Sequence, residues 1–431
     1  MLCLAAASAA GSGNLPFAPA PLFASGTGDY RLDAMLYPNL NRWNSIAALG
    51  TPVPVTYSFL TSANDPDDDI GFLRLNDIQI AGARTAFAAW ETAANIKFVE
   101  VSSGGDIALG TNIQSASAAY AYRPGRSFVQ EGDIYLSSQS FSNQDMSSGS
   151  YGLLTMVHEI GHAIGLKHPG NYNAAGSGTP PYLPLAEDNI NNSVMSYYDF
   201  GSPYPSTPRS YDILGVQYLY GAKRDTGIVY NQSGDVLATT GTSGADALVG
   251  INLNDVMTGG TGADAIYGQT GDDTIYGNQD SDTLSGGEGN DVLFGGRNND
   301  TVYGDNGNDV VYGNFLNDVI YGGNGNDLMY GGADEDTILG GAGADTLFGN
   351  LGNDSMLGGS GADRFVINSG NDTIGDFSFS AGDRIRVASG TSISAAGASD
   401  GAVISFSNSS ATVKLIGVSA SSVNSSYLEF A

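Results

Sequence analysis

The chain has 431 residues, enough for two or three domains. Its 45 acidic and 16 basic residues give a formal net charge of −29, which argues against nucleic acid or anionic lipid as a partner. No run of about 18 apolar residues predicts a membrane span, and the one cysteine, Cys3, cannot form a disulfide within the chain.

The N-terminal segment is apolar and rich in alanine, but the first basic residue is Arg31. A secretory signal peptide begins with basic residues. We therefore expect residues 1–28 to form a flexible leader or a pro-segment.

Residues 29–225 have the mixed composition of a globular α+β domain. Runs rich in Val, Ile and aromatic residues predict five short strands, at residues 53–59, 96–101, 107–110, 120–122 and 133–136. Apolar residues at helical spacing predict two helices, at residues 75–94 and 151–166. Residues 171–208 are rich in Pro, Gly, Ser and Asn and predict a long loop.

All three histidines lie within eleven residues, in the segment His158-Glu159-Ile160-Gly161-His162-Ala163-Ile164-Gly165-Leu166-Lys167-His168. Residues four apart share a helix face, so His158 and His162 can bind one metal ion. Gly165 allows the helix to end, and the chain can then bring His168 back as a third ligand. Three protein ligands leave one position open for water, which is typical of a catalytic zinc site. Glu159 lies beside that position, where it can take a proton from the attacking water and pass it to the leaving amine.

A His-Glu-x-x-His motif alone also occurs by chance, but the eleven-residue form is specific. Downstream, Ser193-Val194-Met195-Ser196-Tyr197 resembles the Met-turn that underlies the zinc ion in metzincins, although Met195 on its own would fit ordinary core packing. Within the metzincins, the chain resembles the serralysin-type secreted proteases. The segments that show this resemblance are residues 56–59, 90–101, 119–122, 158–170, 186–188 and 212–221. The resemblance implies an α+β metzincin domain with one catalytic zinc ion.

The resemblance also implies roles for two further parts of this domain. Tyr197 would be an additional zinc ligand at rest, and would swing away to hydrogen-bond the developing oxyanion. Ala119, Tyr120 and Ala121 would lie on an edge strand that pairs with an extended substrate. An aromatic strand of this kind also fits plain core packing.

From Gly241 the sequence repeats with a period of nine. Aspartate occupies every ninth position from Asp246 to Asp372, fifteen in all, and an apolar residue follows two places after each of them. Such a unit predicts a parallel β-roll in which two units form one turn, over residues 226–378. With strands ~4.8 Å apart the roll would be roughly 35 Å long. A disordered Gly/Asp-rich linker would not keep these positions in phase.

The loops of this roll suit calcium, which takes six to eight oxygen ligands. Glycine permits tight turns and lets backbone carbonyl groups face an ion, and each aspartate adds an anionic oxygen. Loops 18 residues apart stack on one edge and share ions. The residues expected to bind calcium are Gly259, Gly262, Asp264, Gly268, Gly271, Asp273, Asp282, Gly286, Gly289, Asp291, Asp300, Gly304, Gly307, Asp309, Gly322, Gly325, Asp327, Asp336, Gly340, Gly343, Asp345, Asp354, Gly358, Gly361, Asp363 and Asp372.

The repeat resembles the RTX repeats of proteins exported by type I secretion, whose signal lies at the C-terminus. Glu429-Phe430-Ala431 is similar to such a signal. Short alternating segments predict a small β cap over residues 379–431, which would include that signal. Without calcium the crowded carboxylates should keep the roll unfolded, and extracellular calcium would couple binding to folding.

The two edges of the roll are expected to differ. On one edge a glycine stands two places before each aspartate from Gly271 to Gly361, whereas the other edge has Leu316 at that place. A branched apolar residue is strained in the left-handed region that this turn requires. The edge through Asp318 is therefore expected to have a missing or distorted calcium site, and Leu253 should disturb the first site of the regular edge.

The leading hypothesis is a secreted, monomeric zinc endopeptidase that acts on proteins or peptides and is stabilised by calcium. Two alternatives stay open. One is a calcium-dependent surface or adhesion protein with a relic protease domain. The other is a processing protease that acts on one surface protein rather than a broad digestive enzyme.

Overall fold

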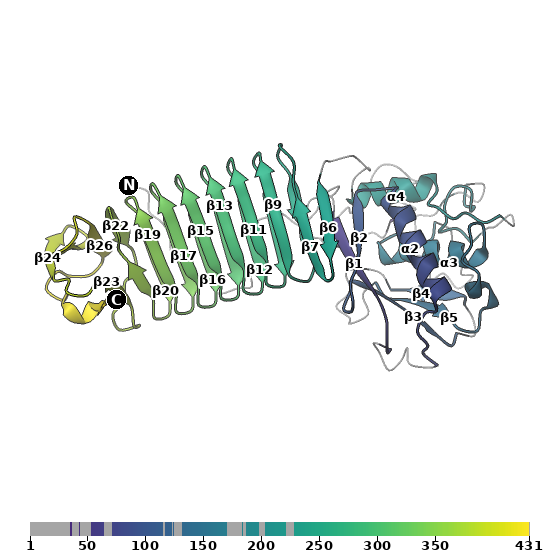
Figure 1. Ribbon diagram of the computed structural model, residues 1–431, viewed down its shortest axis with the longest axis horizontal. Helices are drawn as coiled ribbons and strands as arrows, with labels where there is room; N and C mark the ends of the chain where they lie inside the picture. Colours follow the sequence, from purple (N-terminus) through teal and green to yellow (C-terminus); the bar gives the residue numbers. More distant parts are fainter. Residues whose placement is uncertain are drawn as a thin grey trace.

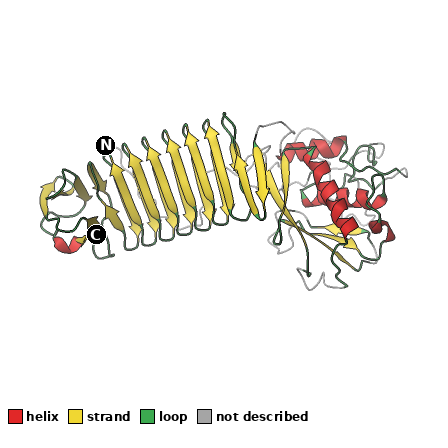
Figure 2. Ribbon diagram, viewed as in Figure 1, coloured by secondary structure: helices red, strands yellow, loops and turns green. Residues whose placement is uncertain are grey.

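The computed structural model describes residues 35–36, 43, 53–63, 71–114, 117–122, 124, 132–169, 183, 187–197, 203–220 and 228–430. The described part of the chain is elongated (Figure 1). A domain with α-helices and a sheet lies at one end, a roll of strands forms the middle, and a small cap lies at the other end (Figure 2). The predicted leader, residues 1–28, lies outside the described residues.

Five strands form the sheet of the N-terminal domain, in the order β2-β1-β3-β5-β4. Their bounds are β1 Val53–Phe59, β2 Ile96–Glu100, β3 Ile107–Asn112, β4 Ala119–Ala121 and β5 Ile134–Ser137. Four strands run parallel, and β4 runs antiparallel to β5 at one edge of the sheet. All five predicted strands are present, with ends that differ from the predicted ones by at most two residues.

Three α-helices share one apolar core with this sheet. They are α2 Asp77–Glu91, α3 Tyr151–Ala163 and α4 Ser210–Tyr220, and a short 3₁₀-helix, η1, spans Phe141–Gln144. The side chain of Asn76 accepts a hydrogen bond from the Gln79 backbone N–H, and the Gln79 side chain accepts one from the Asn76 N–H, which starts α2 with a capping box. Trp90 is fully buried, and its Nε1 donates to the Val157 carbonyl oxygen at 3.0 Å. This bond fixes α2 against α3.

All three α-helices differ from the prediction. α2 begins two residues after the predicted start and ends three residues before the predicted end. α3 ends at Ala163, three residues before the predicted end, because Gly165 adopts φ +105° and turns the chain. α4 is not among the predicted helices. Buried and partly buried residues surround much of its axis instead of forming one stripe, so the helical period is weak in its sequence.

Strands of the roll alternate between two parallel sheets, which we call the β10 sheet and the β11 sheet. The β10 sheet contains β8 Ala247–Val249, β10 Ala265–Thr270, β12 Thr283–Glu288, β14 Thr301–Asn306, β16 Val319–Asn324, β18 Thr337–Ala342, β20 Ser355–Ser360 and β22 Asn371–Ile374. The β11 sheet contains β7 Val236–Thr240, β9 Asp255–Thr261, β11 Thr274–Gln279, β13 Val292–Arg297, β15 Val310–Phe315, β17 Leu328–Ala333, β19 Thr346–Leu351 and β21 Arg364–Val366, and β6 Val229–Ser233 pairs antiparallel with β7.

Neighbouring strands within a sheet pair residues 18 positions apart, as Ala265 with Thr283 and Thr274 with Val292. The apolar residue two places after each repeat aspartate is fully buried between the sheets, from Leu248 to Ile374. Both features confirm the predicted parallel β-roll.

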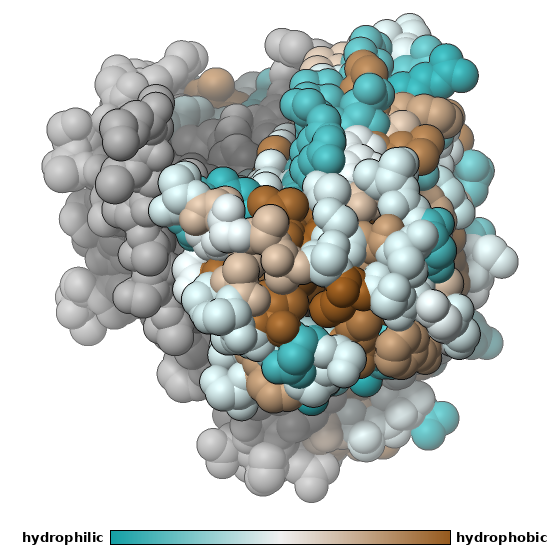
Figure 3. All heavy atoms as spheres, turned by 90° about the vertical axis from the view of Figure 1, so that its left-hand side faces the viewer, coloured by the Kyte–Doolittle hydropathy of each residue, from teal (hydrophilic) through white to brown (hydrophobic). Residues whose placement is uncertain are grey.

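The cap extends both sheets of the roll. It contains β23 Arg384–Val387, β24 Ile393–Ala398, β25 Gly401–Phe406, β26 Thr412–Ile416, η2 Ser425–Tyr427 and β27 Leu428–Phe430. β26 pairs with β22, and β27 pairs with β23. Seen from this end, apolar residues gather at the centre of the described surface (Figure 3). Phe379 and Phe430 are the large apolar residues after position 378 that are exposed in the described part of the chain.

The first turns of the roll contact the N-terminal domain directly. Val99 and Val101 form a buried cluster with Leu237 and Ile251. The backbone N–H and Oγ of Ser102 donate to the Asp235 carboxylate at 2.8 and 2.6 Å, and Asn252 donates to Asp106 at 2.7 Å. The contact lies at the β2 side of the sheet, opposite the β4 edge.

Candidate metal centres and catalytic cleft

α3 places the first two histidines of the motif one turn apart. The helix begins at Ser150, whose Oγ accepts a hydrogen bond from the Leu153 N–H at 3.1 Å. Because His158 and His162 are four residues apart, their rings leave the helix on one face. His158 is 8% exposed, since the neighbouring Val157 and Ile160 lie in the core.

The third histidine reaches the same point through the turn that follows α3. Gly165 allows this turn, and the Leu166 N–H donates to the Gly161 carbonyl oxygen at 2.9 Å. Nε2 of His168 then lies 3.1 Å from Nε2 of His158 and 2.9 Å from Nε2 of His162. The structure brings together all three predicted histidine ligands, whose ligand atoms lie within 4.8 Å of one another.

Backbone carbonyl groups orient two of the three rings. Nδ1 of His158 lies 2.7 Å from the Val194 oxygen, and Nδ1 of His162 lies 2.9 Å from the Leu166 oxygen. A carbonyl oxygen accepts only, so in both rings Nδ1 holds the proton. Nε2 of each ring therefore presents a lone pair to the common point.

The histidines are neutral at pH 7. Burial lowers the pKa of His158 to about 4, and burial together with His158 lowers the pKa of His162 to about 3. The pKa of His168 is also lowered, by burial and by both other rings. Three converging neutral imidazole nitrogens, two of them in rings whose tautomer is fixed, fit a zinc ion that keeps an open position.

Glu159 is buried next to the first ligand. Burial raises the pKa of its carboxyl group to about 8. A carboxyl group whose pKa lies near neutrality can both accept and return a proton. Glu159 also lines the cleft described next, so it is accessible to a bound substrate.

A cleft of about 330 Å³ opens beside the three histidines. It is lined by Ser117, Ala118, Ala119, Tyr151, Leu154, Thr155, His158, Glu159, Ile190, Val194, Ser196 and Tyr197. Ala119 begins the edge strand β4, which also contains Tyr120 and Ala121 and pairs with β5 on one side. A sheet edge therefore borders the same cleft as Glu159.

Tyr197 lies next to the third histidine. Its ring centroid is 4.4 Å from that of His168 and 5.6 Å from that of His158, and the residue is 58% exposed. An exposed ring at this place can move without disturbing the core. The structure is thus compatible with the role that the sequence resemblance implies for Tyr197.

Met195 and its turn lie beneath α3. The Met195 side chain is fully buried against Gly161, where an added side chain would collide with the methionine sulfur. Its backbone N–H donates to Ser193 Oγ at 3.0 Å. The turn thereby presents the Val194 carbonyl group to His158.

Asp212 in the first turn of α4 holds this turn in place, a role that the sequence did not signal. Its carboxylate accepts hydrogen bonds from Ser193 Oγ at 2.6 Å and from the Val194 N–H at 2.8 Å. The Arg209 N–H donates to it at 2.7 Å. Asp212 is fully buried, and burial raises its pKa to about 6. The available signal was the place of Asp212 at the start of the segment 212–221, which resembles the serralysin type, and this does not by itself suggest a link to a ligand.

The repeat aspartates share one arrangement along the roll. From Asp264 to Asp372, one carboxylate oxygen of each accepts the backbone N–H of the aspartate 18 residues earlier, as Asp291 Oδ1 does from Asp273 at 2.7 Å. The other oxygen is buried and has no partner among the described residues, in Asp264, Asp273, Asp282, Asp291, Asp300, Asp309, Asp318, Asp327, Asp336, Asp345, Asp354 and Asp363.

The space next to each of these oxygens is kept open by a glycine. A side chain at Gly268 would collide with the free oxygen of Asp273 and with the Gly286 carbonyl oxygen. Each hollow is therefore bounded by a carboxylate oxygen and a backbone oxygen, the hard ligands that calcium prefers. Burial raises the pKa of Asp273 and Asp318 to about 8, so ionising these groups at neutral pH requires a cation nearby.

The two edges of the roll keep the same carboxylate arrangement but differ in backbone strain. Leu316 has φ +70°, in the left-handed region, and Phe315 before it is 59% exposed. The strain expected in this loop is present. Asp318 nevertheless accepts the Asp300 N–H at 2.8 Å like its neighbours, so the expected distortion of its site stays a prediction.

The first loop of the regular edge departs from the repeat for another reason. Ile251 is buried in the cluster with the N-terminal domain, and Leu253 packs against that cluster. Asn252 between them is hydrogen-bonded to Asp106. This loop is part of the domain contact.

Comparison with known proteins matches both parts of the chain. The matrixin family matches residues 52–175, which include the three histidines. The RTX calcium-binding nonapeptide repeat matches six overlapping segments, at residues 240–275, 249–284, 276–311, 303–338, 312–347 and 339–374. The chain combines a matrixin domain with RTX calcium-binding repeats. Its two sets of metal-binding residues correspond to zinc in the matrixin domain and structural calcium in the RTX repeats.

Several serralysins are similar to the chain. Serralysin A of Dickeya chrysanthemi is 36% identical over 235 residues, 48% of this chain and 48% of that protein. Serralysin C of the same organism is 34% identical over 231 residues, with the same two shares. Metallopeptidase AprA of Pseudomonas marginalis is 36% identical over 227 residues, 46% of this chain and 47% of that protein. The chain spans about half the length of the curated relatives that it matches.

Proposed function

We propose that the chain is a secreted, serralysin-like zinc endopeptidase that hydrolyses peptide bonds and is folded and stabilised by calcium. The observation that supports this most directly is the convergence of three neutral histidine nitrogens beside the buried Glu159. These groups border a cleft that a sheet edge also reaches. A relic domain of an adhesion protein would not need this intact set of groups.

In this proposal the chain's own residues move the protons. A zinc ion held by His158, His162 and His168 would supply Lewis-acid chemistry, polarising water and the scissile carbonyl group. Glu159 takes a proton from the attacking water and later gives it to the leaving amine. The Tyr197 hydroxyl group would be a further ligand of that ion at rest, and donates a hydrogen bond to the developing oxyanion.

The edge strand β4 gives the substrate a place to bind. A peptide in extended conformation can add to an open sheet edge through backbone hydrogen bonds. Ala119, Tyr120 and Ala121 would supply these groups, and Ala119 lines the cleft that contains Glu159. Binding through backbone groups selects extended segments of protein or peptide substrates.

The roll and cap support secretion as the route of this protease. Residues 29–225 form the protease domain, residues 226–378 the calcium-binding roll and residues 379–431 the cap with a type I secretion signal. The roll needs calcium to ionise its buried aspartates, so the chain would fold after export, where calcium is abundant. No helix in the described part of the chain is long and apolar enough to span a membrane. The working state is a monomer.

The proposal is tested by zinc analysis and by digestion of an unfolded protein. Calcium-loaded protein should contain about one zinc ion per chain and should cleave internal peptide bonds, identified by mass spectrometry of the products. A zinc-selective chelator should stop cleavage, and added zinc should restore it. Protein that is loaded with both metals but releases no internal peptides would refute the proposal.

A further inference from the structure

The outer face of the β11 sheet carries a continuous row of aromatic rings. Tyr276, Phe294, Tyr312, Tyr330 and Phe348 occupy the same place in five successive strands. Their ring centroids are 4.6–4.9 Å apart, and neighbouring planes differ by 3–20°. The inner rings cover one another's faces, so the row presents its ring edges to solvent as an apolar ridge.

A second column of residues runs next to this ridge, and asparagine and glycine alternate along it. Its members are Asn278, Gly296, Asn314, Gly332 and Asn350, and all have positive φ. A side chain at Gly296 would collide with the backbone oxygen of Asn278, so only glycine fits there. Between each pair of asparagines the sheet surface therefore stays bare.

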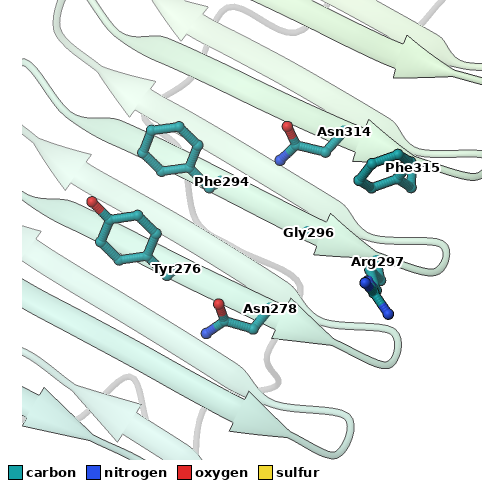
Figure 4. A pocket seen from close by; sticks show the side chains of 7 residues that line it. All are labelled: Tyr276, Asn278, Phe294, Gly296, Arg297, Asn314 and Phe315. Carbon is teal, nitrogen blue, oxygen red and sulfur yellow. The ribbon is translucent and has the colours of Figure 1, made fainter.

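A hollow lies over Gly296 (Figure 4). Tyr276 and Phe294 line it on the side of the ridge, Arg297 and Phe315 line it at the strand ends, and the side chains of Asn278 and Asn314 flank it. The combination is that of a small-molecule site, with apolar walls and a few polar groups.

The polar groups at this hollow have unused hydrogen-bonding capacity. Among the described residues, no hydrogen bond or ion pair joins the side chains of Arg297, Asn278 or Asn314 to another residue. Arg297 is also the one basic residue of the sequence between positions 228 and 363, a segment rich in aspartate. Many aspartate carboxylates of the roll could pair with its guanidinium group, but Arg297 lines the hollow instead.

We propose that this flank of the roll binds a neutral saccharide chain. A sugar ring offers hydroxyl groups, which both donate and accept, and apolar C–H groups. The amides of Asn278 and Asn314 can likewise both donate and accept, Arg297 adds donors, and the rings offer apolar packing. A polyanionic glycan is disfavoured by the formal net charge of −29.

An extended peptide fits this surface less well than a saccharide. β13 is paired with β11 on one side and with β15 on the other, so its backbone groups are used within the sheet. A peptide could not add to the sheet here as it could at an edge. A ligand at this face must therefore be bound by side chains, and the hydroxyl groups of a saccharide can hydrogen-bond to such side chains.

Part of this arrangement recurs along the roll, without the arginine, since Ala333 stands at the place of Arg297 two strands later. Gly332 lies between Asn314 and Asn350, next to Tyr330, two strands after Gly296. With strands ~4.8 Å apart, the repeat of this pattern is roughly 10 Å. A polymer lying along the roll would meet asparagine side chains and an aromatic ring at regular intervals, and Arg297 once. Such binding would hold the protein on glycan-rich material independently of its proposed peptide hydrolysis.

The test is electrophoresis of the calcium-loaded full chain in native gels that contain a polysaccharide. The probes are hydroxyethyl cellulose and galactomannan, which are neutral, and polygalacturonate, which is acidic. We expect at least one neutral polymer to slow migration. The double variant Asn278→Gly, Asn314→Gly should weaken that effect about five-fold or more, since each lost hydrogen bond lowers affinity several-fold.

Glycine is the replacement of choice because it accepts the positive φ of both positions without strain. The matched control is Asp305→Gly, which changes the same column on the β10 sheet, where φ is +76°. Both proteins should keep the circular dichroism and the peptide hydrolysis of the wild type. The proposal is overturned if neither neutral polymer slows migration, if the double variant migrates like the wild type, or if polygalacturonate alone binds.

Discussion

At the scale of single residues, the zinc site depends on groups that do not touch the metal. The Val194 and Leu166 carbonyl groups fix the proton on Nδ1 of two histidines, and Asp212 holds the backbone of Val194. Partners of this kind typically change metal affinity 10–100-fold. The site is therefore sensitive to residues on α4 as well as on α3.

Replacing Tyr197 with phenylalanine should lower the catalytic rate much more than it weakens substrate binding. The ring would keep its contact with His168, but the hydroxyl group would no longer stabilise the transition state. Loss of one such donor costs on the order of 10²-fold in rate. Steady-state kinetics on a peptide substrate give both parameters. An unchanged rate with a raised KM would show that Tyr197 only packs against the substrate.

Asp212→Asn should lower both stability and zinc affinity. Ser193 Oγ and the Val194 N–H donate to separate carboxylate oxygens, whereas an amide group has one acceptor oxygen and would turn its NH₂ group toward one of these donors. We expect a loss of about 1–3 kcal/mol in the free energy of unfolding, and zinc affinity lower by about 10–100-fold. Thermal unfolding and zinc competition with a chelator measure the two effects.

The control for this variant is Asp77→Asn, an exposed aspartate in the first turn of α2. Its effect on stability should stay within about 0.5 kcal/mol. Equal zinc affinity in Asp212→Asn and wild-type protein would show that Asp212 stabilises α4 but does not position a ligand.

At the scale of elements, the nine-residue repeat and the histidine motif predicted structure well, whereas contacts between separate elements were not predicted. The nine-residue repeat fixes the turn and the buried position of every unit, so the roll and its core follow from the sequence. The eleven-residue histidine motif likewise predicted the helix, the turn at Gly165 and the third ligand. The link from Asp212 to Val194 was not predictable, because its residues lie on separate elements and its bonds include backbone groups. The disturbance of the first site by Leu253 stays a prediction, and the contact of its loop with the N-terminal domain was not predictable, because the packing partners lie in the other domain.

Leu316→Gly should relieve strain in one loop of the roll. An L-residue in the left-handed region costs about 1–2 kcal/mol, while glycine adds about 0.5–1 kcal/mol of unfolded-state entropy. We therefore expect the variant to be as stable as the wild type or more stable by up to about 1 kcal/mol, and to bind calcium more tightly at the Asp318 edge. Calcium titration followed by thermal unfolding measures both.

The matched substitution on the regular edge should do the opposite. Gly325 has φ +133°, and an added side chain would collide with the Gly307 carbonyl oxygen. Gly325→Ala should therefore destabilise the roll by about 2 kcal/mol or more. If Leu316→Gly lowered stability and calcium affinity as Gly325→Ala does, backbone strain would not distinguish the two edges.

At the scale of the whole molecule, calcium removal should unfold the roll, from about residue 241 to about residue 378. The buried carboxylates would lose their cations while facing one another along each edge. Far-ultraviolet circular dichroism of the full chain in excess chelator should show a large loss of strand signal. Strand signal that persists without calcium would contradict the expected coupling of binding and folding.

The stability of the metal-free roll should fall as the pH rises. Burial raises the pKa of Asp273 to about 8 and that of Asp291 to about 6, against the ordinary value of 3.8. The metal-free folded state then binds more protons than the unfolded state, so its stability falls as pH rises from about 4 to about 8. In chelator, strand signal should be greater at pH 5 than at pH 8. The reverse order would show that the carboxylates are not buried without calcium.

The central claim is that the matrixin domain hydrolyses peptide bonds with Glu159 as the base and three histidines as the zinc ligands. The most direct test measures zinc content and peptide hydrolysis on the same sample of Glu159→Ala, alongside the wild type, with calcium present. We expect the variant to keep about one zinc ion per chain and to lose about 10²–10⁴-fold in turnover, because it lacks the group that moves the proton. A variant that retains zinc and more than about a tenth of wild-type turnover would contradict the assignment of Glu159.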